Sequence, residues 1–196
     1  MRLRLASTLL LALVALAAPG LARAAGGSYV FDGGSPAEQA QVRAAIDASS
    51  FDWSLVPQTI TIHIQPGVSS EATVGNIWLD SNLVDAGRFA WGVVQHEYAH
   101  QVDFFLLDDA KRQELQAALG GSSWWQSAAG QAHGDLASER FASTLAWSFW
   151  QSKDNVMAPD STGGESGAVG PARFRALLAQ VLGQPALAPA ARHVAT

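Results

Sequence analysis

One five-residue segment, His96-Glu97-Tyr98-Ala99-His100, constrains this chain more than any other part of it. Residues four apart lie on one face of an α-helix, about one turn from each other. Two imidazoles in that arrangement can bind a single Zn²⁺ from the same side, at about 2.0–2.1 Å each. The segment therefore predicts a helix that carries two ligands of one metal ion.

The acidic residue within the segment adds the chemistry. Glu97 follows His96 by one residue, roughly 100° around the helix, so its carboxylate is expected beside the metal rather than on it. Zinc lowers the pKa of a bound water to about 7, and a carboxylate in this place can take the water's proton. Spacing and residue types together predict metal-assisted hydrolysis of an amide, with Glu97 as general base.

Residues 85–107 have the pattern of the helix that the motif requires, and Asp85 is a plausible N-cap. Asp103 lies three residues after His100, so it either accepts a ring N–H from that histidine or is a solvated carboxylate near the helix end. The positions that recur at spacings of four, three, four and three are Phe89, Val93, His96, His100 and Asp103.

A catalytic zinc site usually has three protein ligands and one open position, so a third ligand is needed. Residues 135–147 predict a second, mostly apolar helix, and Glu139 is its expected inward carboxylate. Asp135, one turn earlier on the same face, is the runner-up. His133, in a glycine-rich turn, is a third candidate. Glu139 could instead pair with an arginine at the surface.

These features resemble the gluzincins, the thermolysin-like and aminopeptidase-like metallopeptidases in which a glutamate on a later helix follows the HExxH motif. The segment Ser138-Glu139-Arg140-Phe141-Ala142-Ser143 is similar to the Asn-Glu-Gly-Phe-Ala-Ser type of segment around their third ligand. Two departures are Arg140 in place of the glycine and the 38 residues between His100 and Glu139. The resemblance covers about a third of the chain.

The resemblance implies that His96, His100 and Glu139 bind Zn²⁺ and that Glu97 is the general base. It also implies an α+β, zincin-like fold, with a small mixed sheet, an edge strand next to the active-site helix, and a second ligand-bearing helix.

Residues 72–80 predict a short strand just before the zinc helix. In gluzincins an edge strand at this place pairs with an extended substrate backbone. The resemblance thus implies substrate contacts from Gly75, Asn76, Ile77 and Trp78, the alternative being an ordinary half-buried strand.

Hydrolysis also needs a hydrogen-bond donor for the developing oxyanion. Thermolysin-like enzymes use a histidine or a tyrosine, but Tyr98 is on the wrong side of its helix and Tyr29 is near the expected mature N-terminus. His133 is a possible oxyanion donor. The other candidates are Asn155, Arg173 and Arg175.

Three segments predict an exported protein: a signal peptide at 1–24, one metallopeptidase domain at 25–184 and a flexible tail at 185–196. The leader has a basic start, an apolar stretch at 5–18 and an Ala-Arg-Ala cleavage site ending at Ala24. The apolar stretch is shorter than the roughly 20 residues of a membrane span, so we expect secretion; a retained N-terminal anchor is the alternative.

The amino-acid composition excludes several kinds of site and of binding partner. The chain has no cysteine, which excludes disulfides, thiolate zinc ligands and cysteine nucleophiles. Its formal net charge is −5, and loss of the three leader arginines brings the mature chain close to −8. Such an acidic chain argues against nucleic-acid binding and against attraction to anionic lipid.

The remaining elements complete an α+β organisation around one core. His63 alternates with isoleucines and is expected on a sheet face rather than at a metal. The predicted elements are a helix at 36–48 with a Ser35/Glu38 capping box, a strand at 59–64, helices at 108–119 and 122–125, a long surface loop at 152–170, and a last helix from Pro171 to about Gly183.

Together these features predict a secreted, monomeric zinc endopeptidase acting on peptides or proteins. An endopeptidase is favoured because so short a chain has little material to enclose one end of a cleft. The alternatives are a non-catalytic extracellular binding module with a structural zinc, and an α+β interaction protein without metal.

Overall fold

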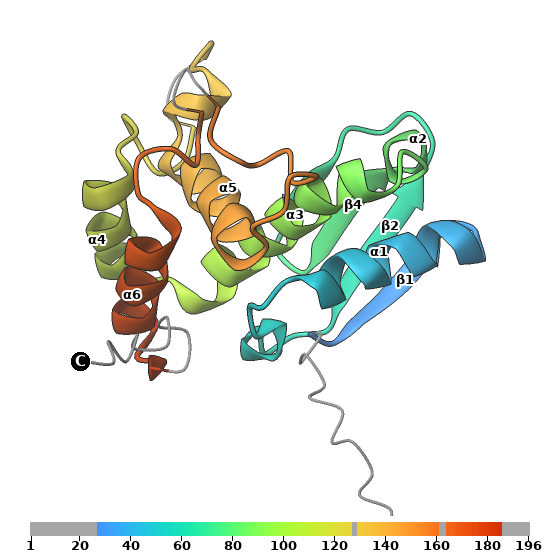
Figure 1. Ribbon diagram of the computed structural model, residues 1–196, viewed down its shortest axis with the longest axis horizontal. Coiled ribbons are helices and arrows are strands. Elements are labelled where there is room, and N and C mark those ends of the chain that lie inside the picture. Colours follow the sequence, from blue (N-terminus) through green and yellow to red (C-terminus); the bar gives the residue numbers. More distant parts are fainter. Residues whose placement is uncertain (1–26, 127–128, 161–163, 186–196) are drawn as a thin grey trace, which may run out of the picture.

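A small sheet covered by helices makes up the computed structural model, which describes residues 27–126, 129–160 and 164–185 (Figure 1). The predicted leader at 1–24 and nearly all of the predicted tail at 185–196 lie outside the described residues. The strands are β1 (Tyr29–Gly33), β2 (Ile60–Gln65), β3 (Glu71–Thr73) and β4 (Asn76–Asp80). The helices are α1 (Pro36–Ala48), α2 (Ser81–Val84), α3 (Arg88–Leu106), α4 (Asp109–Leu119), α5 (Ala137–Phe149) and α6 (Pro171–Leu182), with 3₁₀ turns η1 (Trp53–Leu55) and η2 (His133–Asp135).

The sheet has the order β1-β2-β4-β3 and is mixed, because β1, β2 and β4 are parallel and β3 is antiparallel to β4. Alternation sets its two faces: Ile60, Ile62 and Ile64 of β2 are buried in the core. His63 points to the other face, where it contacts Asp32 and stacks on Trp78, as expected for a sheet-face residue. The α+β prediction is confirmed.

The prediction of one edge strand over residues 72–80 is wrong. This segment contains most of a hairpin, in which β3 and β4 are joined at Val74 and Gly75, and Thr73 pairs with Asn76. Gly75 has a φ of +79°, which glycine adopts readily. Since β4 lies between β2 and β3, the edge of the sheet on this side is β3.

Helix α3 is the centre of the molecule and packs against α1, α5 and β3. Every residue from Val94 to Asp103 is buried. The helix begins after Gly87 and not at Asp85, which instead ends α2. Tyr98 packs on Trp53 with ring centroids 4.8 Å apart, so it faces the core; it is on the wrong side of the helix for an oxyanion donor, as predicted. No helix in the described residues is both long enough and apolar enough to cross a bilayer.

One side chain ties α3 to the β3–β4 hairpin. Gln101, fully buried, accepts a hydrogen bond from the Gly75 N–H at 2.9 Å and donates to the carbonyls of Thr73 and Asn76 at 3.0 and 3.1 Å. It directly follows His100, so the position of the edge strand is coupled to that of the predicted ligand.

Three predicted helices, α1, α4 and α6, are confirmed with their end signals. Ser35 and Glu38 form the capping box of α1, Asp108 caps α4, and α6 begins with Pro171. The capping side chains bond to backbone N–H groups that a helix end leaves unpaired, and a proline at the first position has no N–H to leave unpaired. These residues therefore allowed the helix boundaries to be predicted.

Other predictions for the C-terminal half need correction. Residues 122–125 are not helical; Ser123 forms an isolated parallel bridge with Leu136. The second ligand helix begins at Ala137, so Asp135 lies outside it, in η2. In Figure 1, α5 crosses α3. Helices α6 and α4 pack beside α5, on the side away from the sheet.

Candidate metal centre

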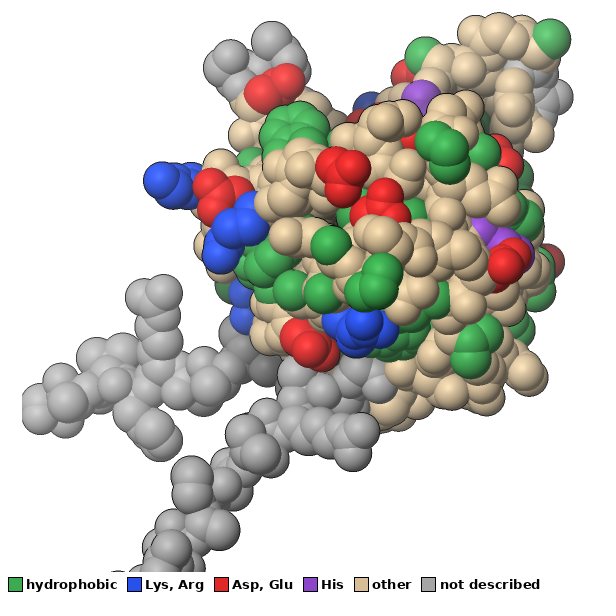
Figure 2. All heavy atoms as spheres, turned by 90° about the vertical axis from the view of Figure 1, so that its right-hand side faces the viewer, with side chains coloured by type: hydrophobic (Ala, Val, Ile, Leu, Met, Phe, Trp, Pro, Cys, Tyr) green, Lys and Arg blue, Asp and Glu red, His purple; other side chains and the backbone are tan. Residues whose placement is uncertain are grey.

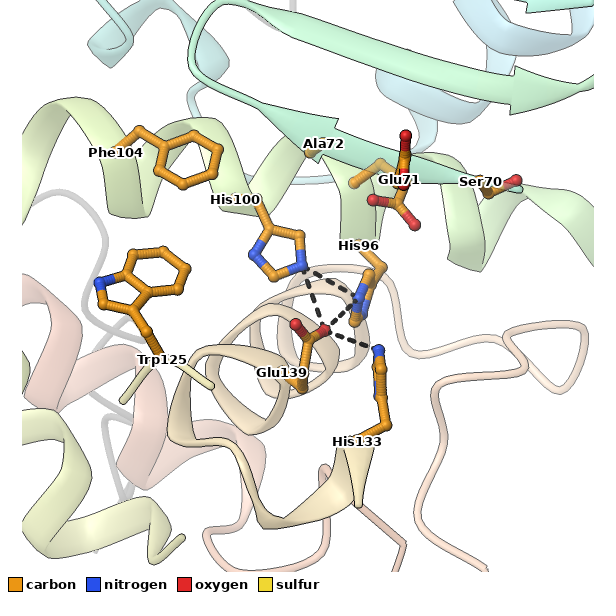
Figure 3. A pocket seen from close by; sticks show the side chains of 10 residues that line it. Ser70, Glu71, Ala72, His96, His100, Phe104, Trp125, His133 and Glu139 are labelled. Atoms are coloured by element: carbon orange, nitrogen blue, oxygen red, sulfur yellow. Dashed lines mark hydrogen bonds and ion pairs between the residues drawn. The ribbon is translucent and has the colours of Figure 1, made fainter. Parts of the chain in front are cut away.

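Helices α3 and α5 bring His96, His100 and Glu139 together (Figure 3). The two Nε2 atoms of the histidines lie 3.2 Å apart. Oε2 of Glu139 lies 3.1 Å from Nε2 of His96 and 3.2 Å from Nε2 of His100. Both histidines are buried and the glutamate is nearly so. This group could hold a metal ion.

The separations fit one ion. Donor atoms about 2.0–2.1 Å from a tetrahedral zinc lie about 3.3 Å from one another, close to the 3.1–3.2 Å between these three atoms. Three lone-pair-bearing atoms that face each other in a buried site need a cation or shared protons to be stable. The donor set therefore fits a metal with two imidazole ligands and one carboxylate ligand.

The charges of the group point the same way. Burial alone would raise the pKa of Glu139, but hydrogen bonds with His100, His133 and His96 outweigh it and hold the pKa well below its usual range. Burial alone would lower the pKa of His100, but its hydrogen bond with Glu139 raises it instead. A carboxylate that stays ionised among imidazoles is ready to bind a cation in place of a proton.

Glu97 lies beside this group and not in it, as predicted. It lines the same pocket and is 6% exposed. Within the described residues its side chain makes no hydrogen bond or ion pair, and burial raises its pKa. A buried carboxylate without a hydrogen-bond partner, next to three side chains that could hold a metal ion, is suited to accept a proton.

A hydrogen-bond chain behind His96 was missed by the sequence reasoning. Ser143 Oγ lies 3.1 Å from Nδ1 of His96 and donates to Oε2 of Glu165 at 2.8 Å. Because the hydroxyl of Ser143 donates its one proton to Glu165, the Nδ1–H of His96 must donate to the Ser143 oxygen. This leaves the Nε2 lone pair free for a metal. Glu165 lies in the long loop at 152–170, where the sequence carries no signal for it.

The same glutamate holds His133. Oε1 of Glu165 lies 2.9 Å from Nδ1 of His133, whose Nε2 lies 3.1 Å from Oε2 of Glu139. His133 is 64% exposed at the pocket rim and does not belong to the three-residue group. It remains the predicted oxyanion donor.

The other ligand and donor candidates lie elsewhere. Asp135 is exposed and outside the ligand group. Asn155 binds the carbonyls of Ala146 and Trp150, and Arg175 binds that of Ser148. None of these residues, nor Arg173, lines the pocket.

Asp103 does not form the predicted bond with His100. It is fully buried and accepts hydrogen bonds from Nε of Arg112 and from Nε1 of Trp124, both at 2.8 Å. Nδ1 of His100 has no hydrogen-bond partner among the described residues. Helical spacing placed Asp103 near the ligand face, but the short carboxylate reaches α4 and the segment after it.

We expect Asp103→Asn to lower the free energy of unfolding by about 3 kcal/mol, because removing one charge of a buried pair leaves the other uncompensated. Zinc binding should be unchanged. Urea denaturation and metal analysis measure the two effects. Asp109→Asn, which removes the exposed second carboxylate on Arg112, should cost less than about 0.5 kcal/mol. If the Asp103→Asn variant instead lost zinc at unchanged stability, that result would support the predicted hydrogen bond between Asp103 and His100.

The pocket next to His96, His100 and Glu139 is bounded on one side by β3. On the other side it is bounded by the aromatic side chains of Phe104 and Trp125 and by η2 (Figure 3). The predicted substrate contacts do not line it: Ile77 is in the core, Trp78 is on the far sheet face, and Gly75 binds Gln101. The strand at the pocket is β3. Its lining residues are Ser70, Glu71, Ala72, His96, Glu97, His100, Phe104, Trp125, His133 and Glu139.

Comparison with known proteins gives no evidence on the function of this site. No protein-family model, curated protein or solved structure matches the chain significantly. What the arrangement can do chemically therefore follows from its own residues: three converging side chains that could hold a metal ion, an adjacent carboxylate, and a pocket next to a strand edge.

Proposed function

We propose that this protein is a secreted zinc peptidase that hydrolyses peptide bonds with a metal-activated water and Glu97 as general base. One observation carries the proposal: His96, His100 and Glu139 converge at 3.1–3.2 Å in the pocket that Glu97 also lines. We infer a gluzincin-like arrangement within a zincin-like α+β fold.

The donor set favours zinc among the common metals. Calcium and magnesium prefer sites made of oxygen ligands alone. Two imidazoles and one carboxylate suit zinc, and a catalytic zinc site leaves a fourth position open. His133, the next nearest imidazole, is mostly exposed and contacts Glu139 rather than completing the group.

Each residue then has a defined task. His96, His100 and Glu139 would hold the zinc, which would supply a Lewis acid for activating water and polarising the substrate carbonyl. Glu97 takes the proton of the attacking water and passes it to the leaving amine. His133 is held through Nδ1 by Glu165, and we propose that its Nε2–H turns from Glu139 to the developing oxyanion.

Strand β3 gives a place for the substrate backbone. Within the described residues it pairs with β4 alone, so the main-chain groups of its other edge have no strand partner there, next to the pocket. An extended peptide can add to such an edge by main-chain hydrogen bonds. Gln101 holds the hairpin at a fixed distance from His100 and so sets the height of the peptide over the ligands.

Surface charge agrees with a peptide substrate rather than a nucleic acid. On the face in Figure 2, acidic side chains are interspersed with the few Lys and Arg side chains, and no extended basic patch is formed. We propose a monomeric endopeptidase, since β3 and the pocket are open to a chain that continues past the scissile bond.

The rival function is a binding module that uses the zinc as a structural brace. The observation that favours it is the 3.1 Å contact of His133 with Glu139, which brings a third imidazole, and thus a fourth candidate ligand, close to the group. Glu97 argues against it, because a closed structural site does not need an unpartnered buried carboxylate.

Metal removal tests the proposal. The purified protein should contain one zinc per chain and cleave a peptide library, lose cleavage in chelator and regain it with added zinc. Zinc at a thousand times its Kd should also raise the free energy of unfolding by about 4 kcal/mol. Cleavage that persists without metal would contradict the proposal, and zinc binding without cleavage would favour the brace.

A further inference from the structure

An aromatic pair extends the pocket away from the metal ligands. Phe104 lies one turn after His100 on α3, and its ring is 6.3 Å from the imidazole, inclined by 27°. Trp125 continues the stack, with its ring 5.5 Å from that of Phe104 and inclined by 16°. Both line the same pocket as the ligands (Figure 3).

Trp125 is exposed but held in place. Its side chain is 41% exposed, and the guanidinium of Arg112 lies over its ring at 5.5 Å. Arg112 is fixed by the buried Asp103, which also binds the indole N–H of the neighbouring Trp124. The role of Asp103 is therefore to support this aromatic pair through Arg112 and Trp124.

A tryptophan that is exposed at a pocket rim and held by its neighbours is suited to contact a bound molecule. Exposing a large aromatic surface to water is unfavourable, whereas a rigid aromatic side chain at a pocket rim gains contact area at a small entropic cost. Residues of this type, held by their neighbours, dominate the energy of many recognition sites. The one other exposed aromatic side chain in the described residues, Phe89, lies in the first turn of α3, far from the ligands.

The opposite side of the pocket fixes how a peptide would meet this pair. Glu71 and Ala72 of β3 line it, together with Ser70 just before the strand, across from Trp125 (Figure 3). A peptide extended along β3 directs alternate side chains to opposite sides. With its scissile bond over the ligands, a neighbouring side chain would enter the space at Phe104 and Trp125. The carboxylate of Glu71, which lines the same pocket and is not one of the proposed ligands, disfavours an acidic side chain there.

We propose that Phe104 and Trp125 form an apolar subsite that selects peptides with a large apolar side chain, above all an aromatic one, next to the scissile bond. This inference rests on the proposed function and names its substrate class. A hydrophobic pocket discriminates between side chains of different size by about 10-fold or more. We expect at least that preference for phenylalanine over alanine, and rejection of aspartate.

Two measurements test the subsite. In the first, peptides that differ only beside the scissile bond (Phe, Leu, Ala or Asp) are cleaved by wild type, Trp125→Ala and Phe89→Ala. Wild type and Phe89→Ala should share the Phe-over-Ala preference in kcat/KM, and Trp125→Ala should lose most of it while still binding one zinc. Trp125→Leu, which keeps an apolar side chain, should retain part of it and guards against misfolding of the alanine variant.

In the second, fluorescence anisotropy measures how tightly labelled Phe and Ala peptides bind zinc-loaded Glu97→Gln, which is designed to bind without cleaving. Tighter binding of the Phe peptide, lost on adding Trp125→Ala, supports the subsite. Equal cleavage and equal binding of both peptides would overturn it and leave the peptidase proposal intact. No cleavage by wild type would instead contradict the proposed function, and binding would then decide the subsite alone.

Discussion

Replacing Glu97 with Gln should reduce peptide cleavage by about 10²–10⁴-fold while one zinc per chain stays bound, because a positioned general base contributes that much to proton-transfer steps. Glutamine keeps the shape of the side chain but cannot take a proton. Glu97 makes no hydrogen bond within the described residues and is not among the ligands, so its loss should leave the fold and the metal group intact.

The measurement is kcat at saturating peptide together with zinc content. Glu114→Gln is the matched control, since Glu114 is an exposed carboxylate on α4 whose only described side-chain contact, with Gln180, an amide oxygen can replace. The control should cleave like wild type. A Glu97→Gln variant with full activity would remove Glu97 from the mechanism, and one that loses zinc would make it a ligand.

Replacing Glu139 with Ala should weaken zinc binding by more than about 100-fold and abolish cleavage. Changing groups that only support a ligand already costs 10- to 100-fold in metal affinity or activity, so removing a ligand itself should cost more. Glu139 Oε2 is the atom that both His96 and His100 approach, which makes it the centre of the group. Chelator competition measures the affinity, and circular dichroism checks the fold.

Asp135→Ala is the control for this variant. Asp135 lies four residues earlier, is exposed, and belongs to η2 rather than to α5. It should bind zinc as wild type does. Wild-type affinity in Glu139→Ala, or a loss confined to Asp135→Ala, would show that the third ligand is misassigned.

The convergence of His96, His100 and Glu139 could be predicted because its signals are local. A four-residue spacing on a helix fixes the relation of His96 to His100 without tertiary information. Glu139 needed only the inference of a second helix with an inward carboxylate. The choice between Glu139 and Asp135 depended on where α5 begins, and Leu136, its N-cap residue, carries no side-chain cap to mark that boundary.

The substrate side of the site was harder to predict, because it depends on pairing between segments. The run from Ala72 to Asp80 reads as one strand unless Gly75 is recognised as a turn. That error put the predicted contacts largely on β4, whereas the strand that lines the pocket is β3. β1 was missed because its five residues give too short an alternating pattern.

Long-range contacts were not predictable from the sequence at all. Spacing placed Asp103 near His100, but the choice of Arg112 and Trp124 as its partners depends on how α4 packs. Glu165 lies in a loop without periodicity, and only the folded chain brings it to Ser143 and His133.

The most direct test of the central claim is a crystal structure of the zinc-loaded protein with anomalous diffraction data at the zinc edge. We predict one zinc peak bound by Nε2 of His96, Nε2 of His100 and Oε2 of Glu139, with a water in the fourth position within reach of Glu97. A peak elsewhere, or a site closed by His133 as a fourth protein ligand, would contradict a catalytic zinc centre.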